Sequence, residues 1–206
     1  ALPIAGRYRI IDFVLSNMAN AGITNIGVTT EFNYSSLMDH LKSGKPWDLD
    51  RKNGGLNILP PNLEDGAFAQ IKGNIDLLAG IRNFIDRSRQ TYVILSLGNG
   101  IYNMDFGEVV EKHIESQADV TAVYKDMSGL KESELRRFNL FDIDENGRIT
   151  DIEVQPRYPK ATNAGMDIYV MEKALLQSII DECSARGDND FVKDALIKKI
   201  NGLHIY

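Results

Sequence analysis

Short apolar runs alternate along the chain with segments whose apolar residues recur every three or four positions. The runs are typical of buried β-strands, and the longer period is typical of helices that cover a sheet. Six strands are predicted, over residues 23–30, 91–96, 120–124, 140–143, 149–154 and 166–171. This alternation predicts an α/β fold, built from βαβ units around a mostly parallel sheet.

Three helices stand out between these strands. The longest is predicted over 68–87, where apolar residues form one stripe: Ile71, Ile75, Leu78, Ile81 and Ile85. A second helix is predicted to begin after Asp105, because Asp105 and Glu108 are spaced as in a capping box. A third covers 172–183. Residues 42–62, by contrast, are interrupted by glycines and prolines and are predicted to form a long surface loop.

The composition is that of an ordinary globular protein. Of the 206 residues, 43% are hydrophobic and 25% are charged, which excludes a disordered chain, a collagen and a coiled coil. We expect a single domain over residues 1–206, because a chain of this length builds one sizeable core. The net charge of −6 would repel a polyanionic backbone, so no nucleic-acid partner is expected.

Cysteine usage and hydropathy indicate the compartment. A lone Cys183 excludes an internal disulfide, and no stretch approaches the roughly 20 apolar residues that cross a bilayer. We therefore expect a cytoplasmic location and no membrane partner. The chain begins Ala-Leu-Pro, without Met or the features of a signal peptide, so it is predicted to be a piece of a longer protein.

Residues 142–153 match the loop of an EF-hand at every ligand position, from Asp142 through the turn glycine Gly147 to Glu153. An EF-hand needs a helix that leaves this loop, and Pro156 and Pro159 would stop one within a turn. The alternative is a β-hairpin with a tight turn over 144–147. We expect the hairpin and no calcium.

Two other motifs fail on spacing. Gly98, Asn99 and Gly100 follow a predicted strand, but Asn103 stands where a dinucleotide-binding loop has its third glycine, so no NAD is expected. The histidines lie far apart and have no partner at zinc-ligand spacing, which makes them ordinary core or surface residues: His40, His113 and His204.

Residues 3–17, PIAGRYRIIDFVLSN, resemble the opening of bacterial ADP-glucose pyrophosphorylases. The likeness continues in order through 36–40, 98–105, 153–156 and 190–194, and so covers essentially the whole chain. It implies a Rossmann-like, doubly wound mixed sheet of the nucleotide-diphospho-sugar transferase type. Two pieces of the family have no counterpart in these residues, namely an upstream Gly-rich nucleotide loop with a catalytic Arg and a C-terminal β-helix domain.

The resemblance implies a reaction in which glucose 1-phosphate attacks the α-phosphorus of ATP and pyrophosphate leaves, with Mg²⁺ held by carboxylates. The family's catalytic, metal-binding Asp falls on Asn99, whose neutral amide attracts Mg²⁺ more weakly. The Lys that pairs with the sugar phosphate falls on Gln155, which cannot neutralise a dianion. The second metal-binding Asp is kept as Asp190, although Asp190 would serve equally as a helix N-cap.

Three further positions carry roles that the resemblance implies. Gly66 belongs to a stretch that touches the nucleotide, and Gly98 belongs to the substrate-binding segment after a strand. Arg9 matches a residue near an inter-subunit effector site for phosphorylated metabolites, which makes it a candidate regulatory residue. Asp12 is expected to be a buried structural carboxylate paired with Arg7 or Arg9.

Neutral residues at two charged catalytic positions suggest a regulatory, catalytically impaired subunit of glycogen biosynthesis. The resemblance is nearest to the GlgD-type branch, whose members accompany a catalytic subunit. We therefore expect a catalytic ADP-glucose pyrophosphorylase subunit as partner, weakened Mg²⁺ binding, and ATP, ADP-glucose and glucose 1-phosphate as candidate ligands. The alternative is an active sugar-phosphate nucleotidyltransferase in which Asp105 or Asp188 replaces the missing metal ligand.

Overall fold

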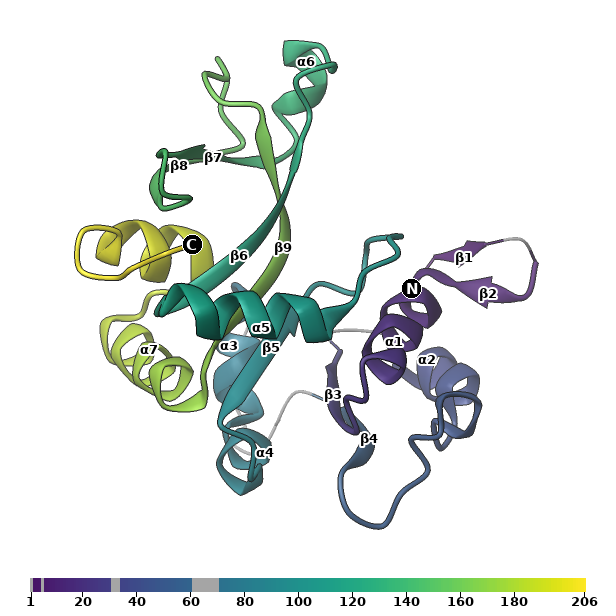
Figure 1. The fold of residues 1–206 in the computed structure, drawn as a ribbon. Helices are drawn as coiled ribbons and strands as arrows, with labels where there is room; N and C mark the ends of the chain where they lie inside the picture. Colours follow the sequence, from purple (N-terminus) through teal and green to yellow (C-terminus); the bar gives the residue numbers. More distant parts are fainter. Residues whose placement is uncertain (1, 5, 31–33, 61–70) are drawn as a thin grey trace. The chain divides into compact units, whose positions relative to one another are not determined.

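The structure, a computed structural model, describes residues 2–4, 6–30, 34–60 and 71–206 (Figure 1). It divides the chain into two compact units. Unit 1 comprises Ala1–Arg89 and Gly98–Glu108, and unit 2 comprises Gln90–Leu97 and Val109–Tyr206. The expectation of a single domain over residues 1–206 stays a prediction.

Unit 1 contains an antiparallel strand pair, a parallel strand pair and several helices. β1 pairs antiparallel with β2, and β3 pairs parallel with β4 from Asn25 opposite Gly55 to Thr29 opposite Leu59. The elements are β1 (Pro3–Ile4), β2 (Tyr8–Arg9), α1 (Ile10–Asn20), β3 (Asn25–Thr29), α2 (Tyr34–Leu41), η1 (Lys45–Trp47), β4 (Gly55–Leu59), α3 (Asn74–Gly80) and α4 (Arg82–Arg87). The buried face of α1 supplies much of the core: Ile11, Val14, Leu15 and Met18.

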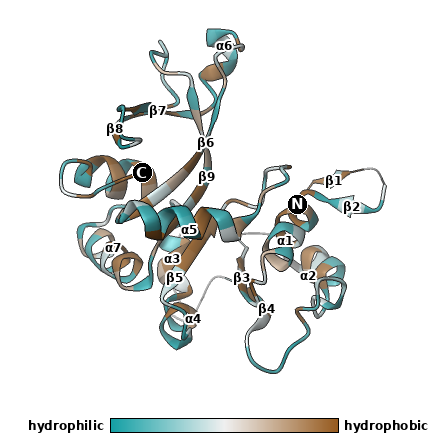
Figure 2. Cartoon of the chain, viewed as in Figure 1, coloured by the Kyte–Doolittle hydropathy of each residue, from teal (hydrophilic) through white to brown (hydrophobic). Residues whose placement is uncertain are grey.

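Unit 2 is built around a five-stranded sheet with the order β5-β9-β7-β8, in which β6 also pairs with β9. The elements are β5 (Tyr92–Ser96), α5 (Phe106–Ser116, which begins in unit 1), β6 (Val120–Asp126), α6 (Glu132–Leu135), β7 (Asn139–Ile143), β8 (Ile149–Val154), β9 (Asn163–Glu172), α7 (Lys173–Arg186) and η2 (Phe191–Ile197). α7 contacts β5 and β9 through its apolar stripe, and Figure 2 shows hydrophobic colour along both strands.

All six predicted strands are present, as β3 and β5 to β9, and β8 has the predicted bounds. The mixed α/β fold is confirmed. The expectation of a mostly parallel sheet is wrong for the described strand pairs. Every strand pair of the five-stranded sheet is antiparallel, and the parallel pair β3–β4 lies outside that sheet. Periodicity predicts which residues are extended and buried, but it carries no information on strand direction.

The predicted loop over 42–62 is wrong in part, because it contains η1 and the strand β4. Gly54 and Gly55 both adopt φ of 81°, and the Gly55 N–H donates to the Thr24 carbonyl. These glycines start a strand at a close approach of two backbones and do not mark a loop. The predicted helix over 68–87 is divided into α3 and α4 directly after Gly80, and its residues 68–70 lie outside the described part of the chain.

The segment with the EF-hand pattern forms a β-hairpin, as predicted. β7 pairs antiparallel with β8, and Gly147 adopts φ of 81° in the turn between them. The Asp144 carboxylate accepts the main-chain N–H groups of Asn146 and Arg148, both at 2.9 Å. The acidic residue at the turn therefore stabilises the hairpin itself.

No helix in the described ranges is long and apolar enough to cross a membrane. The helices are short and amphipathic, and Figure 2 shows hydrophilic colour over much of α5 and α7. His113 and Cys183 are both buried.

The central strand β9 contains Gly165, which faces the fully buried ring of Phe141. A Cβ atom on Gly165 would lie 2.6 Å from Cζ of that ring, closer than real Cβ contacts. We expect Gly165→Ala to lower the free energy of unfolding by about 1–3 kcal/mol. The control Gly129→Ala, whose Cβ would meet nothing within 4 Å, is expected to change it by less than about 0.5 kcal/mol. Urea unfolding measures both, and equal effects would contradict the overpacking.

Candidate functional site

The loop that follows β5 carries Gly98 and Asn99, and both are exposed. Within unit 1 this loop is held by the buried side chain of Asn17. The Asn17 Nδ2 donates to the Tyr102 carbonyl at 2.7 Å, and its Oδ1 accepts the Met104 N–H at 3.5 Å. Sequence reasoning missed this anchor, although Asn17 is a buried polar residue on the apolar side of a helix. The loop thus presents the exposed, neutral amide of Asn99.

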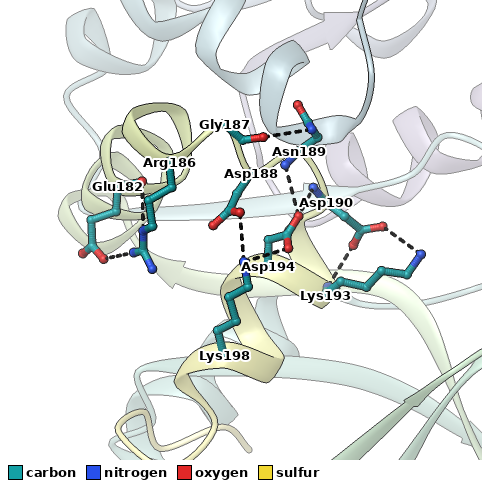
Figure 3. A network of polar contacts seen from close by, with 9 residues as sticks. All are labelled: Glu182, Arg186, Gly187, Asp188, Asn189, Asp190, Lys193, Asp194 and Lys198. Carbon is teal, nitrogen blue, oxygen red and sulfur yellow. Dashed lines mark hydrogen bonds and ion pairs between the residues drawn. The ribbon is translucent and has the colours of Figure 1, made fainter.

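Asp190 stands at the start of η2 and caps it (Figure 3). Its Oδ1 accepts the main-chain N–H groups of Val192 and Lys193, both at 2.9 Å, and its Oδ2 lies 3.8 Å from Lys193 Nζ. Such a cap satisfies N–H groups that have no partner within the helix. The alternative role predicted for Asp190, an N-cap, is therefore present.

Asp194 completes the same turn from the other side (Figure 3). Its Oδ2 accepts the N–H groups of Asn189 and Asp190 at 3.1 and 3.0 Å, and its Oδ1 lies 3.0 Å from Lys198 Nζ. The Asp190 N–H bond, together with Lys198, lowers the pKa of the Asp194 carboxyl to about 2. Asp188 binds Lys198 as well, at 2.9 Å. The turn at 188–190 is thus fixed by carboxylates that bind main-chain groups and a lysine.

Asp194→Ala is expected to lower the Tm by about 2–4 °C at pH 6, because a lost cap costs about 1 kcal/mol. The folded-state pKa of Asp194 is lower than its ordinary value, so its stabilisation is complete above about pH 5 and is lost as the pH falls towards 2. The Tm difference should therefore shrink below pH 4 in thermal scans by circular dichroism. Glu145→Gln is the control, and a Tm difference that is constant from pH 6 to 2 would contradict the assignment.

Asp167, in unit 2, is a second residue that sequence reasoning missed. It lies in β9 with φ of 53°, a conformation that L-residues rarely adopt and that stores strain. Its carboxylate accepts the Tyr169 hydroxyl at 3.5 Å, and the Tyr169 ring packs on Phe191. Burial raises the pKa of the Asp167 carboxyl, and the charge of nearby Asp190 raises it further. The sequence feature that could have pointed to Asp167 is the presence of an acidic residue inside the apolar run 163–172.

Mg²⁺ is bound in proteins through one or two carboxylates together with substrate phosphates. Asn99 offers a neutral amide, and one oxygen of Asp190 already accepts two N–H groups. The replacement ligands are engaged too, since Asp105 Oδ1 accepts the Gly107 N–H at 2.7 Å and Asp188 binds a lysine. Over the part of the chain that the structure describes, no group of three or more His, Cys, Asp and Glu residues could hold a metal ion.

Gln155 follows β8 directly and is exposed. It adopts φ of 44°, and its N–H donates to the Phe138 carbonyl at 3.2 Å. Gly66 lies outside the described residues. The predicted site residues divide between the two units: Arg9, Gly98, Asn99 and Asp105 in unit 1, and Gln155, Asp188 and Asp190 in unit 2.

Arg9 ends β2 and precedes α1. Its Nη2 donates to Ser36 Oγ at 3.0 Å, and its N–H donates to Asp12 Oδ2 at 2.9 Å. Asp12 is buried, as predicted, but the prediction that the side chain of Arg7 or Arg9 pairs with it is wrong. His40 Nε2 lies 2.7 Å from Asp12 Oδ1, and Arg9 contributes only its main chain. α2 therefore supplies the partner, from a residue 28 positions away.

A cavity of about 750 Å³ opens beside this pair within unit 1. Its lining combines cations and aromatic rings, among them Arg7, Lys45, Tyr8 and Trp47. The Trp47 Nε1 donates to Ser16 Oγ at 3.0 Å, which fixes the indole against α1. Asp12 and Asp48 add carboxylates to the same lining, so the cavity carries charges of both signs.

The Nucleotidyl transferase family matches residues 1–204, and the chain belongs to this family. Its relatives include glucose-1-phosphate adenylyltransferases. That of Bacillus licheniformis is 36% identical over all of this chain and 55% of its own length. Those of Clostridium perfringens and Thermosipho melanesiensis are also 36% identical, over 98% and 100% of this chain and 52% and 50% of their own lengths. The chain spans about half the length of these relatives.

Proposed function

We propose that this chain is the nucleotidyltransferase portion of a regulatory, catalytically impaired subunit of glucose-1-phosphate adenylyltransferase in glycogen biosynthesis. The reaction converts ATP and glucose 1-phosphate into ADP-glucose and pyrophosphate. In this proposal the full-length protein binds a catalytic ADP-glucose pyrophosphorylase subunit in the cytoplasm, where the single buried thiol of Cys183 stays reduced. ATP, ADP-glucose and glucose 1-phosphate are ligands that it binds without efficient turnover.

The observation that carries the proposal is the loss of charge at Asn99 and Gln155. Phosphoryl-transfer chemistry depends on charges fixed where the phosphates react, so neutral side chains remove its main source of rate. Asp190, the remaining acidic residue of the family's set, is engaged as a helix cap. These features support weak metal binding and low activity. No observation favours the active alternative, because Asp105 and Asp188 both have structural partners.

A regulatory role finds support at the other end of the chain. Arg9 lies next to the Asp12–His40 pair, and the cavity beside that pair contains further cations. We propose that Arg9 and this cavity take part in binding an anionic effector. Guanidinium groups bind phosphates and carboxylates in bidentate geometry, which suits such a role.

The test is pyrophosphate release from ATP and glucose 1-phosphate by the full-length protein, alone and mixed with the catalytic subunit of the same cell. We expect at least about 100-fold less activity for the protein alone than for the catalytic subunit, since one lost charge-stabilising group costs that much. In the mixture, turnover or the response to effectors should change. Robust activity of the protein alone, or a mixture that equals the sum of its parts, would contradict the proposal.

A further inference from the structure

The loop between β8 and β9 carries an exposed aromatic ring that two guanidinium groups approach. Tyr158 is 68% exposed. Arg157 Cζ lies 5.6 Å and Arg136 Cζ 5.9 Å from the centre of its ring. Arg136 follows the end of α6, and Figure 1 shows α6 and this loop at the same end of unit 2, opposite α7. Two segments some 20 residues apart thus build one surface feature.

The two guanidinium groups have no counter-charge among the residues that the structure describes: neither lies within 4.0 Å of a carboxylate. The nearest acidic residues in sequence bind main-chain N–H groups. Glu134 Oε2 accepts the Lys131 N–H at 3.1 Å, and Glu153 Oε2 accepts the Lys160 N–H at 3.0 Å.

Two more exposed cations flank these groups in sequence. We name the whole set the Arg–Tyr cluster, which consists of Arg136, Arg137, Arg157, Tyr158 and Lys160, all of them exposed. The cluster contrasts with the chain as a whole, whose net charge is −6. Its local charge is therefore complementary to an acidic surface.

The solvent exposure of the Arg–Tyr cluster determines which kind of anionic partner it can bind with useful affinity. An ion pair in open water contributes only about 0–1 kcal/mol, so a small free anion gains little from guanidinium groups on a fully solvated surface. A protein partner that covers the Tyr158 ring excludes water and strengthens each ion pair beneath it. Tyr and Arg are also the residues most enriched where interfaces gain their binding energy.

We propose that the Arg–Tyr cluster is the docking surface for an acidic segment of the catalytic subunit. The inference rests on the proposed function for the identity of this partner. Asp or Glu side chains of the segment bind the guanidinium groups of Arg136 and Arg157, and an apolar side chain covers the ring of Tyr158. The ion pairs of the cluster thereby orient the two subunits and make the Kd of the complex depend on the salt concentration.

The experiment measures the Kd between the full-length protein and the catalytic subunit by isothermal titration calorimetry at 50 and 300 mM NaCl. Two charge-reversal variants with the same change in net charge are compared: Arg136→Glu with Arg157→Glu, and, as control, the exposed pair Arg87→Glu with Arg89→Glu. We expect the cluster variant to raise the Kd at least 30-fold at low salt and to lose most of the salt dependence. The control should change the Kd by less than threefold.

Tyr158→Ser alone should raise the Kd at least tenfold with no change in salt dependence, and equal Tm values confirm that each variant is folded. If the wild-type complex forms and both charge-reversal variants bind alike, the docking surface is overturned while the proposed function stands. If no wild-type complex forms, the proposed function fails, and this inference with it. Inorganic pyrophosphate that binds the cluster at micromolar Kd, with the complex unchanged in the variants, would overturn the docking surface in favour of a small-anion site.

Discussion

Restoring the two lost charges, by Asn99→Asp together with Gln155→Lys in the full-length protein, is expected to raise pyrophosphate release at least about tenfold. Lys at position 155 adds a cation that pairs with the phosphate of glucose 1-phosphate, and charge-assisted hydrogen bonds are about twice as strong as neutral ones. Asp at position 99 adds a carboxylate in place of a neutral amide. Both positions are exposed, so neither substitution disturbs a packed core.

The matched control adds the same charges elsewhere on the surface, by Asn83→Asp together with Gln117→Lys. This control separates a specific gain from a change in net charge, and its pyrophosphate release should equal that of the wild type. Calorimetry provides a second measurement that is independent of turnover. Gln155→Lys alone should lower the Kd for glucose 1-phosphate about tenfold, which corresponds to 1.4 kcal/mol. A double variant that matches its control in both measurements would contradict the role assigned to these positions.

Asp12→Ala is expected to lower the free energy of unfolding of unit 1 by about 2–4 kcal/mol. The substitution removes the carboxylate that accepts the Arg9 N–H at the start of α1, which is worth about 1 kcal/mol as a cap. It also leaves His40 without its partner at 2.7 Å in a half-buried place, which costs a further 1–3 kcal/mol.

The measurement uses the only tryptophan of the chain. Trp47 lines the cavity beside Asp12 and binds Ser16, so its fluorescence during urea unfolding reports on this part of unit 1. Asp39→Ala is the matched control, because Asp39 is an exposed carboxylate on α2 next to His40 in sequence. Unfolding midpoints that coincide for the two variants would show that the Asp12–His40 pair does not stabilise the fold.

Features that depend on neighbours along the chain could be predicted from the amino-acid sequence. The hairpin of β7 and β8 was predictable because alternating apolar residues flank a turn with Asp144 and Gly147, and both signals act within a few residues. The family was predictable because long segments in a fixed order carry its pattern. The neutral residues Asn99 and Gln155 were visible for the same reason, so the proposed loss of activity follows from the sequence.

Contacts between groups that are distant along the chain could not be predicted, because they depend on how the segments pack in three dimensions. β4 exists because Gly54 and Gly55 allow the backbone to approach Thr24, and a run of glycines alone indicated a loop. Asp12 binds His40 instead of an arginine side chain because α2 packs beside α1, a contact that no local pattern encodes. The strained Asp167 and the Arg–Tyr cluster have the same origin, since packing between segments, rather than local propensity, sets their geometry.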